Sequence, residues 1–258
     1  FAMLGGSGGS ATRGVSTDGH IYIDEAIQKG AKAIIAEKFP SKVVERITYL
    51  LVENSSQSLA LAAANYYDNP SEKIQLIGVT GTNGKTSVSD FFYQIFLLEK
   101  KKVGALGTLG FKKNKSLKKR ELTTLDSLKL NRDLNEMKKS GIDNVIIEAS
   151  SHGLHQSRLN FLNIKTGIFT NLSHDHLDYH KSMKNYLNSK LMLFKNILKK
   201  RSTIITDSDI KQYGTLKDIQ KKKKLKIYTI GHRGNIFEVL NHKIFKNFQL
   251  LEIKYNKK

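Results

Sequence analysis

From residue 74 onward, two kinds of hydrophobic pattern alternate along the chain. Short apolar runs, typical of buried strands, occupy 74–79, 103–109, 144–149, 166–170, 202–206 and 226–230. Apolar residues at helical spacing predict helices at 85–99, 125–140 and 182–199. Apolar strands separated by amphipathic helices predict an α/β fold, with a mostly parallel sheet covered by helices on both faces. Ligands of such sheets bind at the carboxyl ends of the strands.

A smaller unit precedes this region. Its pattern predicts a helix at 24–29, strands at 33–36 and 48–52, and an Ala- and Leu-rich helix at 57–67 that ends at Asn69-Pro70. We therefore place a domain boundary at 72/73, between a partial α/β N-terminal domain (1–72) and a larger domain (73–258). Residues 5–10 read Gly-Gly-Ser-Gly-Gly-Ser, a flexible linker composition of natural or engineered origin, and are set aside.

Composition excludes several classes of protein. The 258 residues suffice for one large or two modest domains. No apolar run approaches the ~20 residues of a membrane-spanning helix, and the N-terminus does not resemble a secretory signal. The chain has no cysteine, so it has neither disulfides nor thiolate metal ligands. We expect a cytoplasmic monomer.

The net charge of +20 raises the question of a polyanionic partner. The lysines are scattered, with clusters at 112–119 and 221–224. Aromatic residues do not interleave with these clusters, as they would in a surface that stacks bases. A nucleic-acid binder therefore stays a minor alternative, and attraction of anionic substrates is the milder interpretation of the charge.

A glycine-rich turn joins the first large-domain strand to the following helix. It reads Gly78-Val-Thr-Gly-Thr-Asn-Gly-Lys-Thr-Ser87. Strand, glycine loop and helix N-terminus together form a cradle for nucleotide phosphates, with Lys85 beside the outer phosphates and the Thr86 hydroxyl available to Mg²⁺. The usual pattern has glycine six residues before the lysine, whereas here that residue is Val79. The alternative is a β–α turn that binds nothing.

A second polar site follows the strand at 144–149. Glu148 ends an apolar run and is followed by Ala-Ser-Ser-His152. In a P-loop protein, a carboxylate at this strand end typically reaches the metal of the bound nucleotide, so we favour that role for Glu148. The alternative is a charged side chain on the surface.

A third polar segment, 169–180, is dense in histidine and aspartate. His174, His176 and Asp178 nearly fit the dinuclear metallohydrolase pattern H-x-H-x-D-H, but the next histidine, His180, comes one residue late. A polar loop with capping residues is the other interpretation. Lys190, within the helix expected at 182–199, looks by itself like an ordinary solvated lysine.

Four segments in this order resemble one family. They are Gly81-Thr-Asn-Gly-Lys-Thr86, Glu148-Ala-Ser-Ser-His-Gly-Leu154, Thr170-Asn-Leu-Ser-His-Asp-His-Leu-Asp-Tyr-His180 and Ser189-Lys-x-x-Leu-Phe194. Together they resemble the Mur ligases of peptidoglycan synthesis, most closely the MurE type. The resemblance runs from about residue 18 to the end of the chain. It implies a Mur ligase central ATP-binding domain at 73–258.

The resemblance implies ATP-dependent amide-bond formation. A substrate carboxylate becomes an acyl phosphate, and an amine then displaces the phosphate. The substrates would be UDP-N-acetylmuramoyl-L-alanyl-D-glutamate and a diamino acid, meso-diaminopimelate or L-lysine, and the cofactors ATP and Mg²⁺. Implied nucleotide contacts are Gly81, Thr82, Asn83, Gly84, Lys85, Thr86 and Asn171. Implied metal ligands are Thr86, Glu148, His176 and Lys190, the last as a carbamate formed with CO₂.

The resemblance also implies the contacts to the UDP-muramoyl peptide. They are Thr123, Thr124, Ser150, Gln156 and Arg158. Leu125 stands where the family's Thr-Thr-Pro motif has proline, which leaves the rigidity of that loop open. Arg158 has the planar guanidinium that holds a carboxylate in two hydrogen bonds, although on sequence alone it could be a surface arginine.

Both ends of the chain depart from the family pattern. Phe1-Ala-Met-Leu resembles an internal strand of the UDP-binding domain, and a C-terminal amino-acid-binding domain is missing after 258. We therefore expect an incomplete form that ligates weakly or not at all. The alternatives are a non-catalytic nucleotide-binding fragment and another Mur-superfamily ligase, such as a folylpolyglutamate synthetase or a cyanophycin-type enzyme. The segments at 148–154 and 123–124 argue against the latter.

Overall fold

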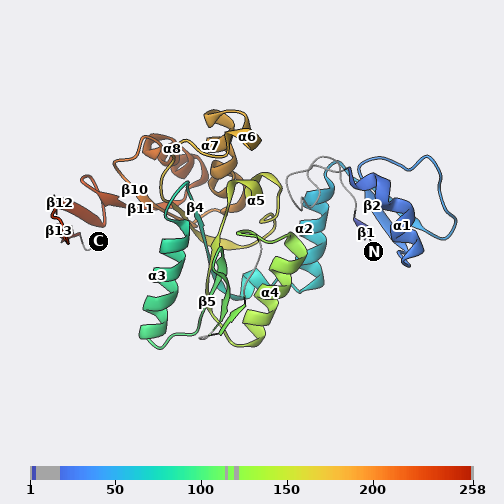
Figure 1. Cartoon of the computed structure of the whole chain (residues 1–258), viewed down its shortest axis with the longest axis horizontal. Coiled ribbons are helices and arrows are strands. Elements are labelled where there is room, and N and C mark those ends of the chain that lie inside the picture. The colour runs from blue at the N-terminus through green and yellow to red at the C-terminus, as the bar shows by residue number, and fades with distance from the viewer. Residues whose placement is uncertain (1, 4–17, 114–115, 119–121, 257–258) are drawn as a thin grey trace.

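The computed structural model describes residues 2–3, 18–113, 116–118 and 122–256. A large α/β body occupies the middle of the molecule, a small N-terminal unit lies at one end, and a C-terminal hairpin lies at the other (Figure 1). The Gly/Ser stretch at 5–10 and parts of the lysine cluster at 112–119 fall outside the described residues.

The small unit is built on a three-stranded parallel sheet. Strand β1 (Ala2–Met3) pairs with β2 (Ala33–Ala36), and β2 pairs with β3 (Thr48–Leu51). The 3-10 turn η1 (Gly19–Tyr22) and helix α1 (Ile23–Gln28) precede β2. Helix α2 (Ser55–Tyr66) follows and packs against α4 (Ser127–Lys139) of the large body, so it joins the two units. The domain boundary at 72/73 stays a prediction.

The large sheet has the order β13-β12-β11-β10-β9-β4-β8-β5-β6-β7. Its parallel centre consists of β4 (Gln75–Thr80), β5 (Val103–Gly107), β8 (Asn144–Glu148), β9 (Ile164–Phe169), β10 (Thr203–Asp207) and β11 (Lys226–Gly231). The antiparallel edges are β6 (Gly110–Lys113) with β7 (Ser116–Lys118) and β12 (Phe237–Ile244) with β13 (Gln249–Tyr255). The expected mostly parallel α/β sheet is confirmed.

Helices cover both faces of this sheet. One face packs against α3 (Lys85–Leu98) through Val79, Tyr93 and Ile146. The opposite face packs against α4 (Ser127–Lys139), α7 (Met183–Met192), the π-helical turn η3 (Leu193–Ile197) and α8 (Tyr213–Lys223). Side chains alternate between the faces along a strand, so Glu148 lies on the α3 side together with Ile146.

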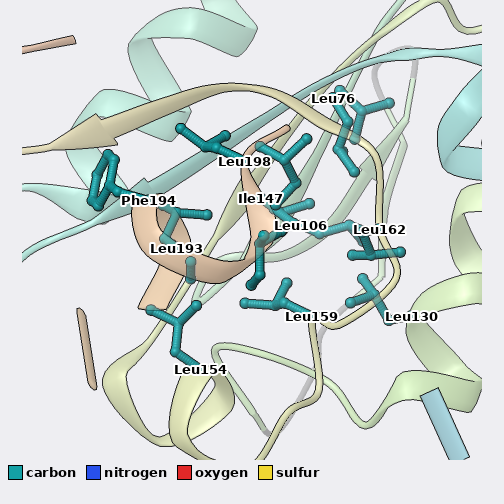
Figure 2. Close-up of a cluster of buried hydrophobic side chains, with 14 of the residues drawn as sticks. Leu76, Leu106, Leu130, Ile147, Leu154, Leu159, Leu162, Leu193, Phe194 and Leu198 are labelled. Carbon is teal, nitrogen blue, oxygen red and sulfur yellow. The ribbon is translucent and has the colours of Figure 1, made fainter. Parts of the chain in front are cut away.

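The larger core lies on the α4 and α7 side (Figure 2). It brings together leucines from strands, helices and loops, including Leu76, Leu106, Leu130, Leu159 and Leu193. In β4, the Cβ of any other residue at Gly78 would lie 3.3 Å from side-chain atoms of Ile164 and Leu193, so this position suits glycine. The two cores fix the directions of β4, β8 and β9, whose carboxyl ends carry the polar motifs.

Several element boundaries differ from the expectation. The helix expected at 182–199 is α-helical only to Met192 and then widens into the π-helical turn η3, where Leu193, Phe194 and Ile197 are buried. Periodicity did not indicate the short helices η2 (Pro70–Lys73), α5 (Ser151–His155) and α6 (Leu177–His180), or the longer α8. The edge hairpins were missed because β7, β13 and most of β12 are exposed, so burial does not impose an apolar run on them. No helix within the described residues is long and apolar enough to cross a membrane.

Candidate active site

The glycine-rich turn lies between β4 and α3, as the sequence predicted. Gly84 caps α3 with a φ of 83°, and Gly81 has a φ of 148°. A Cβ on Gly81 would lie 1.9 Å from Thr170 Oγ1, so only glycine fits between the loop and the end of β9. The loop leads into the N-terminus of α3, where the first backbone amides have no partner within the helix and can bind an anion.

The segment after β9 holds the loop in place. The Thr82 amide donates to the carbonyl of Asn171 at 2.9 Å, and the Asn83 amide donates to Asn171 Oδ1 at 2.9 Å. Thr170 Oγ1 donates to the Asn83 carbonyl at 2.6 Å, and the Ser173 amide donates to Thr82 Oγ1 at 3.0 Å. Asn171, expected near the nucleotide, therefore lies directly against the glycine-rich loop.

Two lysines share one carbonyl of this loop. Lys85 Nζ donates to the Gly81 carbonyl at 3.0 Å and to the Thr82 carbonyl at 2.8 Å, and Lys190 Nζ donates to the Gly81 carbonyl at 2.6 Å. Burial lowers the pKa of Lys85. Burial and, secondly, the nearby Lys85 lower the pKa of Lys190 from 10.5 to about 7. Lys190 is 1% exposed, so the expectation of a solvated lysine was wrong.

The buried carboxylate of Glu148 joins three segments. Thr86 Oγ1 donates to Glu148 Oε2 at 2.9 Å, while the Thr108 amide donates to Oε1 at 2.9 Å and the Thr108 hydroxyl to Oε2 at 3.1 Å. Glu148 is 2% exposed, which excludes the surface-charge interpretation. The Thr86 hydroxyl and a carboxylate are oxygen ligands of the kind that Mg²⁺ prefers.

The histidines His176 and His180 of the 169–180 segment lie in separate environments and do not form one cluster of metal ligands. His176, at a φ of 51°, lies beside its neighbour Asp175, and its ring centroid is 4.9 Å from that of His152. His180 is buried between Ser151 Oγ at 3.0 Å and Ser189 Oγ at 3.3 Å. Within the part of the chain that the structure describes, no three His, Asp or Glu side chains gather as a metal-binding group.

The residues expected to contact the muramoyl peptide lie next to Glu148. Thr124 Oγ1 donates to the Glu148 carbonyl at 2.7 Å and lies 3.0 Å from Ser150 Oγ. Arg158 donates to the Thr124 carbonyl and to Gln156 Oε1, both at 2.6 Å. The 3.1 Å contact between the hydroxyls of Thr123 and Thr108 completes this group.

Leu125, which stands in place of the family's proline, is 8% exposed and packs in the larger core. The loop that contains it is therefore anchored by a buried side chain and by the Arg158 hydrogen bond to Thr124, without a proline ring.

Sequence reasoning missed two residues of the site. Thr108 follows the carboxyl end of β5, and its position after a parallel strand was a signal that could have identified it. Tyr186 is fully buried, and its hydroxyl donates to Thr82 Oγ1 at 3.3 Å. Its ring lies 4.3 Å from Lys190 Nζ, one helical turn away. Only the tertiary structure reveals this contact with the glycine-rich loop.

Known proteins share both the sequence and the fold. A UDP-N-acetylmuramoyl-L-alanyl-D-glutamate--2,6-diaminopimelate ligase of Bacteroides fragilis is 40% identical over 224 residues, which are 87% of this chain and 45% of that protein. A solved structure of a ligase with the same name superposes with a TM-score of 0.77 at 25% identity, covering 91% of this chain and 48% of that chain.

A more distant structure shares the fold alone. It is the MurF ligase of Thermotoga maritima in complex with ADP, with a TM-score of 0.58 at 22% identity over 95% of this chain and 52% of that chain. The chain thus spans about half the length of the relatives that it matches. Residues 79–257 match the Mur ligase middle domain. Because this match covers more than half of the sequence, the chain belongs to the Mur ligase family.

Proposed function

We propose that this chain carries the ATP-binding and peptide-binding part of an ATP-dependent ligase. The ligase would add meso-diaminopimelate or L-lysine to UDP-N-acetylmuramoyl-L-alanyl-D-glutamate, in peptidoglycan synthesis in the cytoplasm. The activity for which the Bacteroides fragilis relative is named supports the substrate class. The observation that carries the proposal is the meeting of the phosphate loop, buried Glu148 and buried Lys190 at the carboxyl ends of β4, β8 and β9.

In this proposal the phosphates of ATP lie against residues 81–86, with Asn171 supporting the loop. Lys85 Nζ, which donates to two loop carbonyls, turns toward the β- and γ-phosphates, since an anion is a stronger partner for an ammonium than a carbonyl is. Because burial disfavours its charged form, Lys85 has more to gain from a phosphate than an exposed lysine would.

The side chains also fit Mg²⁺. Thr86 and Glu148 would hold the ion of the nucleotide through oxygen atoms that already lie 2.9 Å apart. His176 and a carbamate of Lys190 would serve a second ion. Bound Mg²⁺ would neutralise charge that accumulates on the transferred phosphoryl group. With a pKa of about 7, Lys190 is half neutral near pH 7, and the neutral amine is the form that adds to CO₂, releasing a proton.

The reaction then requires mainly positioning. Arg158 and the hydroxyls of Thr123, Thr124 and Ser150 would orient the peptide so that its side-chain carboxylate faces the γ-phosphate. A carboxylate oxygen attacks phosphorus and ADP leaves. The amine attacks the resulting acyl phosphate, loses a proton, and phosphate departs from the tetrahedral intermediate. Because binding already holds the reactants in the reactive geometry, the chemical step does not carry the loss of translational and rotational entropy that free reactants would have in water.

The experiment is a coupled assay on the purified chain with UDP-muramoyl-dipeptide, ATP, Mg²⁺ and either diaminopimelate or lysine, scoring ADP and tripeptide. Equilibrium binding of each substrate is measured beside it. Tripeptide would identify the amino acid. At a minimum, the proposal requires saturable binding of ATP and of the UDP-muramoyl-dipeptide. Arg158→Ala should weaken binding of the dipeptide and leave binding of ATP unchanged. A chain that binds neither substrate refutes the proposal.

A further inference from the structure

A surface rich in lysine lies at the edge of the sheet opposite the phosphate loop. The segment 195–201 precedes β10, and the segment 221–226 leads into β11, whose first residue is Lys226. Both strands run parallel to β9 and, through it, to β4. These residues therefore lie at the amino ends of the strands, whereas the nucleotide and peptide contacts follow the carboxyl ends.

Backbone hydrogen bonds bring the two segments together. The Arg201 amide donates to the Lys224 carbonyl at 3.3 Å, and the Lys226 amide donates to the Ser202 carbonyl at 2.9 Å. The ammonium group of Lys223 points inward and donates to the carbonyls of Lys195 and Leu198. Burial lowers the pKa of Lys223. One lysine of the run is thus structural, and it holds the surrounding charges on a fixed framework.

The remaining cations of the two segments point outward. The segments 195–201 and 221–226 contain no acidic residue, and all eight cations besides Lys223 are exposed. These eight cations are Lys195, Lys199, Lys200, Arg201, Lys221, Lys222, Lys224 and Lys226. We call these eight residues the lysine surface. Glu72, which lies 3.8 Å from Lys199, forms an ion pair at its border.

We propose that the lysine surface docks the protein on a membrane whose surface carries anionic phospholipids. Seven of the eight cations are lysine, a compact and strongly hydrated charge that suits mobile lipid headgroups with no fixed geometry. Nucleic-acid surfaces use arginine forks and stacking aromatics, and these segments have one arginine and no aromatic residue. Docking in this way leaves the site at the opposite edge of the sheet free.

The docking is electrostatic, without insertion. The apolar residues of the two segments, Ile197, Leu198 and Leu225, are buried in the protein and cannot enter the bilayer. A purely electrostatic contact falls off within the Debye length, about 10 Å at 0.1 M salt. Binding therefore has to vanish at high salt and on vesicles of neutral lipid.

The test is co-sedimentation of the purified chain with vesicles of phosphatidylglycerol and phosphatidylcholine, or of phosphatidylcholine alone. One variant replaces Lys199, Lys200, Lys221 and Lys222 with Gln. A matched variant of equal net charge replaces Lys42, Lys184, Lys243 and Lys246, which are also exposed. At about 50 mM salt we expect the first variant to lose roughly a hundredfold or more in partition coefficient, and the second less than fivefold.

Three results would overturn the proposal. Equal losses in the two variants would show that net charge alone acts. Equal binding to neutral vesicles would show that the headgroup charge is irrelevant. Duplex DNA that binds through the same lysines at 150 mM salt, while anionic vesicles do not, would assign the surface to nucleic acid. None of these measurements depends on ligase activity, so they can fail independently of the proposed function.

Discussion

The burial of Lys190 has a measurable cost in stability. Its pKa falls from 10.5 to about 7 because burial disfavours the ammonium form, and because Lys85 repels it. Between these two pH values the unfolded chain binds a proton that the folded chain partly releases. The free energy of unfolding therefore rises with pH across this window, reaches its full value above 10.5, and is lowest below 7.

The size of the effect follows from the linkage relation. Each pH unit within the window is worth about 1.4 kcal/mol for one group, so between pH 7.5 and 9.5 Lys190 alone contributes on the order of 2 to 3 kcal/mol. Replacing it by methionine, which has similar length and no charge, removes this dependence. Lys190→Met also loses the hydrogen bond to Gly81, about 1 kcal/mol. We expect the variant to be more stable than the parent at pH 7.5. This advantage should be much smaller at pH 9.5.

The assay is urea unfolding at both pH values in buffers free of CO₂, so that carbamate formation does not intervene. Lys184→Met, at an exposed position of the same helix, is the control. Its difference from the parent should not change with pH. A difference between parent and Lys190→Met that is the same at pH 7.5 and 9.5 would refute the claim that Lys190 is buried next to a second ammonium group.

Three further predictions concern neighbouring residues. Gly81→Ala should abolish ATP binding and lower the free energy of unfolding by at least about 2 kcal/mol, because the new Cβ meets Thr170 Oγ1. Gly84→Ala, whose Cβ would have no neighbour nearer than 3.9 Å, should lower it by about 1 kcal/mol, as measured by urea unfolding. His180 has its pKa lowered to about 4 by burial and nearby histidines, so stability should fall by about 3 kcal/mol from pH 6.5 to 4, and by less in His180→Gln. Tyr186→Phe should weaken ATP binding severalfold in a titration with fluorescent nucleotide; unchanged affinity would remove its hydroxyl from the loop's support.

The local sequence pattern predicted much of the fold, because strands and helices depend largely on the order of apolar and polar residues that are close in the sequence. Apolar runs located all six central strands to within two residues at each end, and the alternation along β8 explains why Glu148 points to α3. The glycine turn was recognisable because a loop that tightly approaches an anion requires glycines. Boundaries failed where tertiary packing decided them, as in η3, where three buried residues are accommodated by a wider helical turn.

The candidate site was less accessible to sequence reasoning. Lys190 and Tyr186 are ordinary helix residues by pattern, and their importance comes from the contact of α7 with a loop more than 100 positions away. His180 was seen as part of a polar cluster, yet its environment is set by Ser151 and Ser189 on two other helices. Only the family resemblance directed attention to Lys190, and its role as a metal ligand stays a prediction.

The central claim is that Lys85, Thr86, Glu148 and Lys190 form one nucleotide and metal site. The most direct test is calorimetric titration of the purified chain with ATP, with and without Mg²⁺, alongside Lys85→Ala and Glu148→Gln. We predict saturable binding that Mg²⁺ strengthens, loss of binding in Lys85→Ala, and ATP binding in Glu148→Gln that no longer responds to Mg²⁺. Binding with the same affinity and the same Mg²⁺ response in all three proteins would contradict the account.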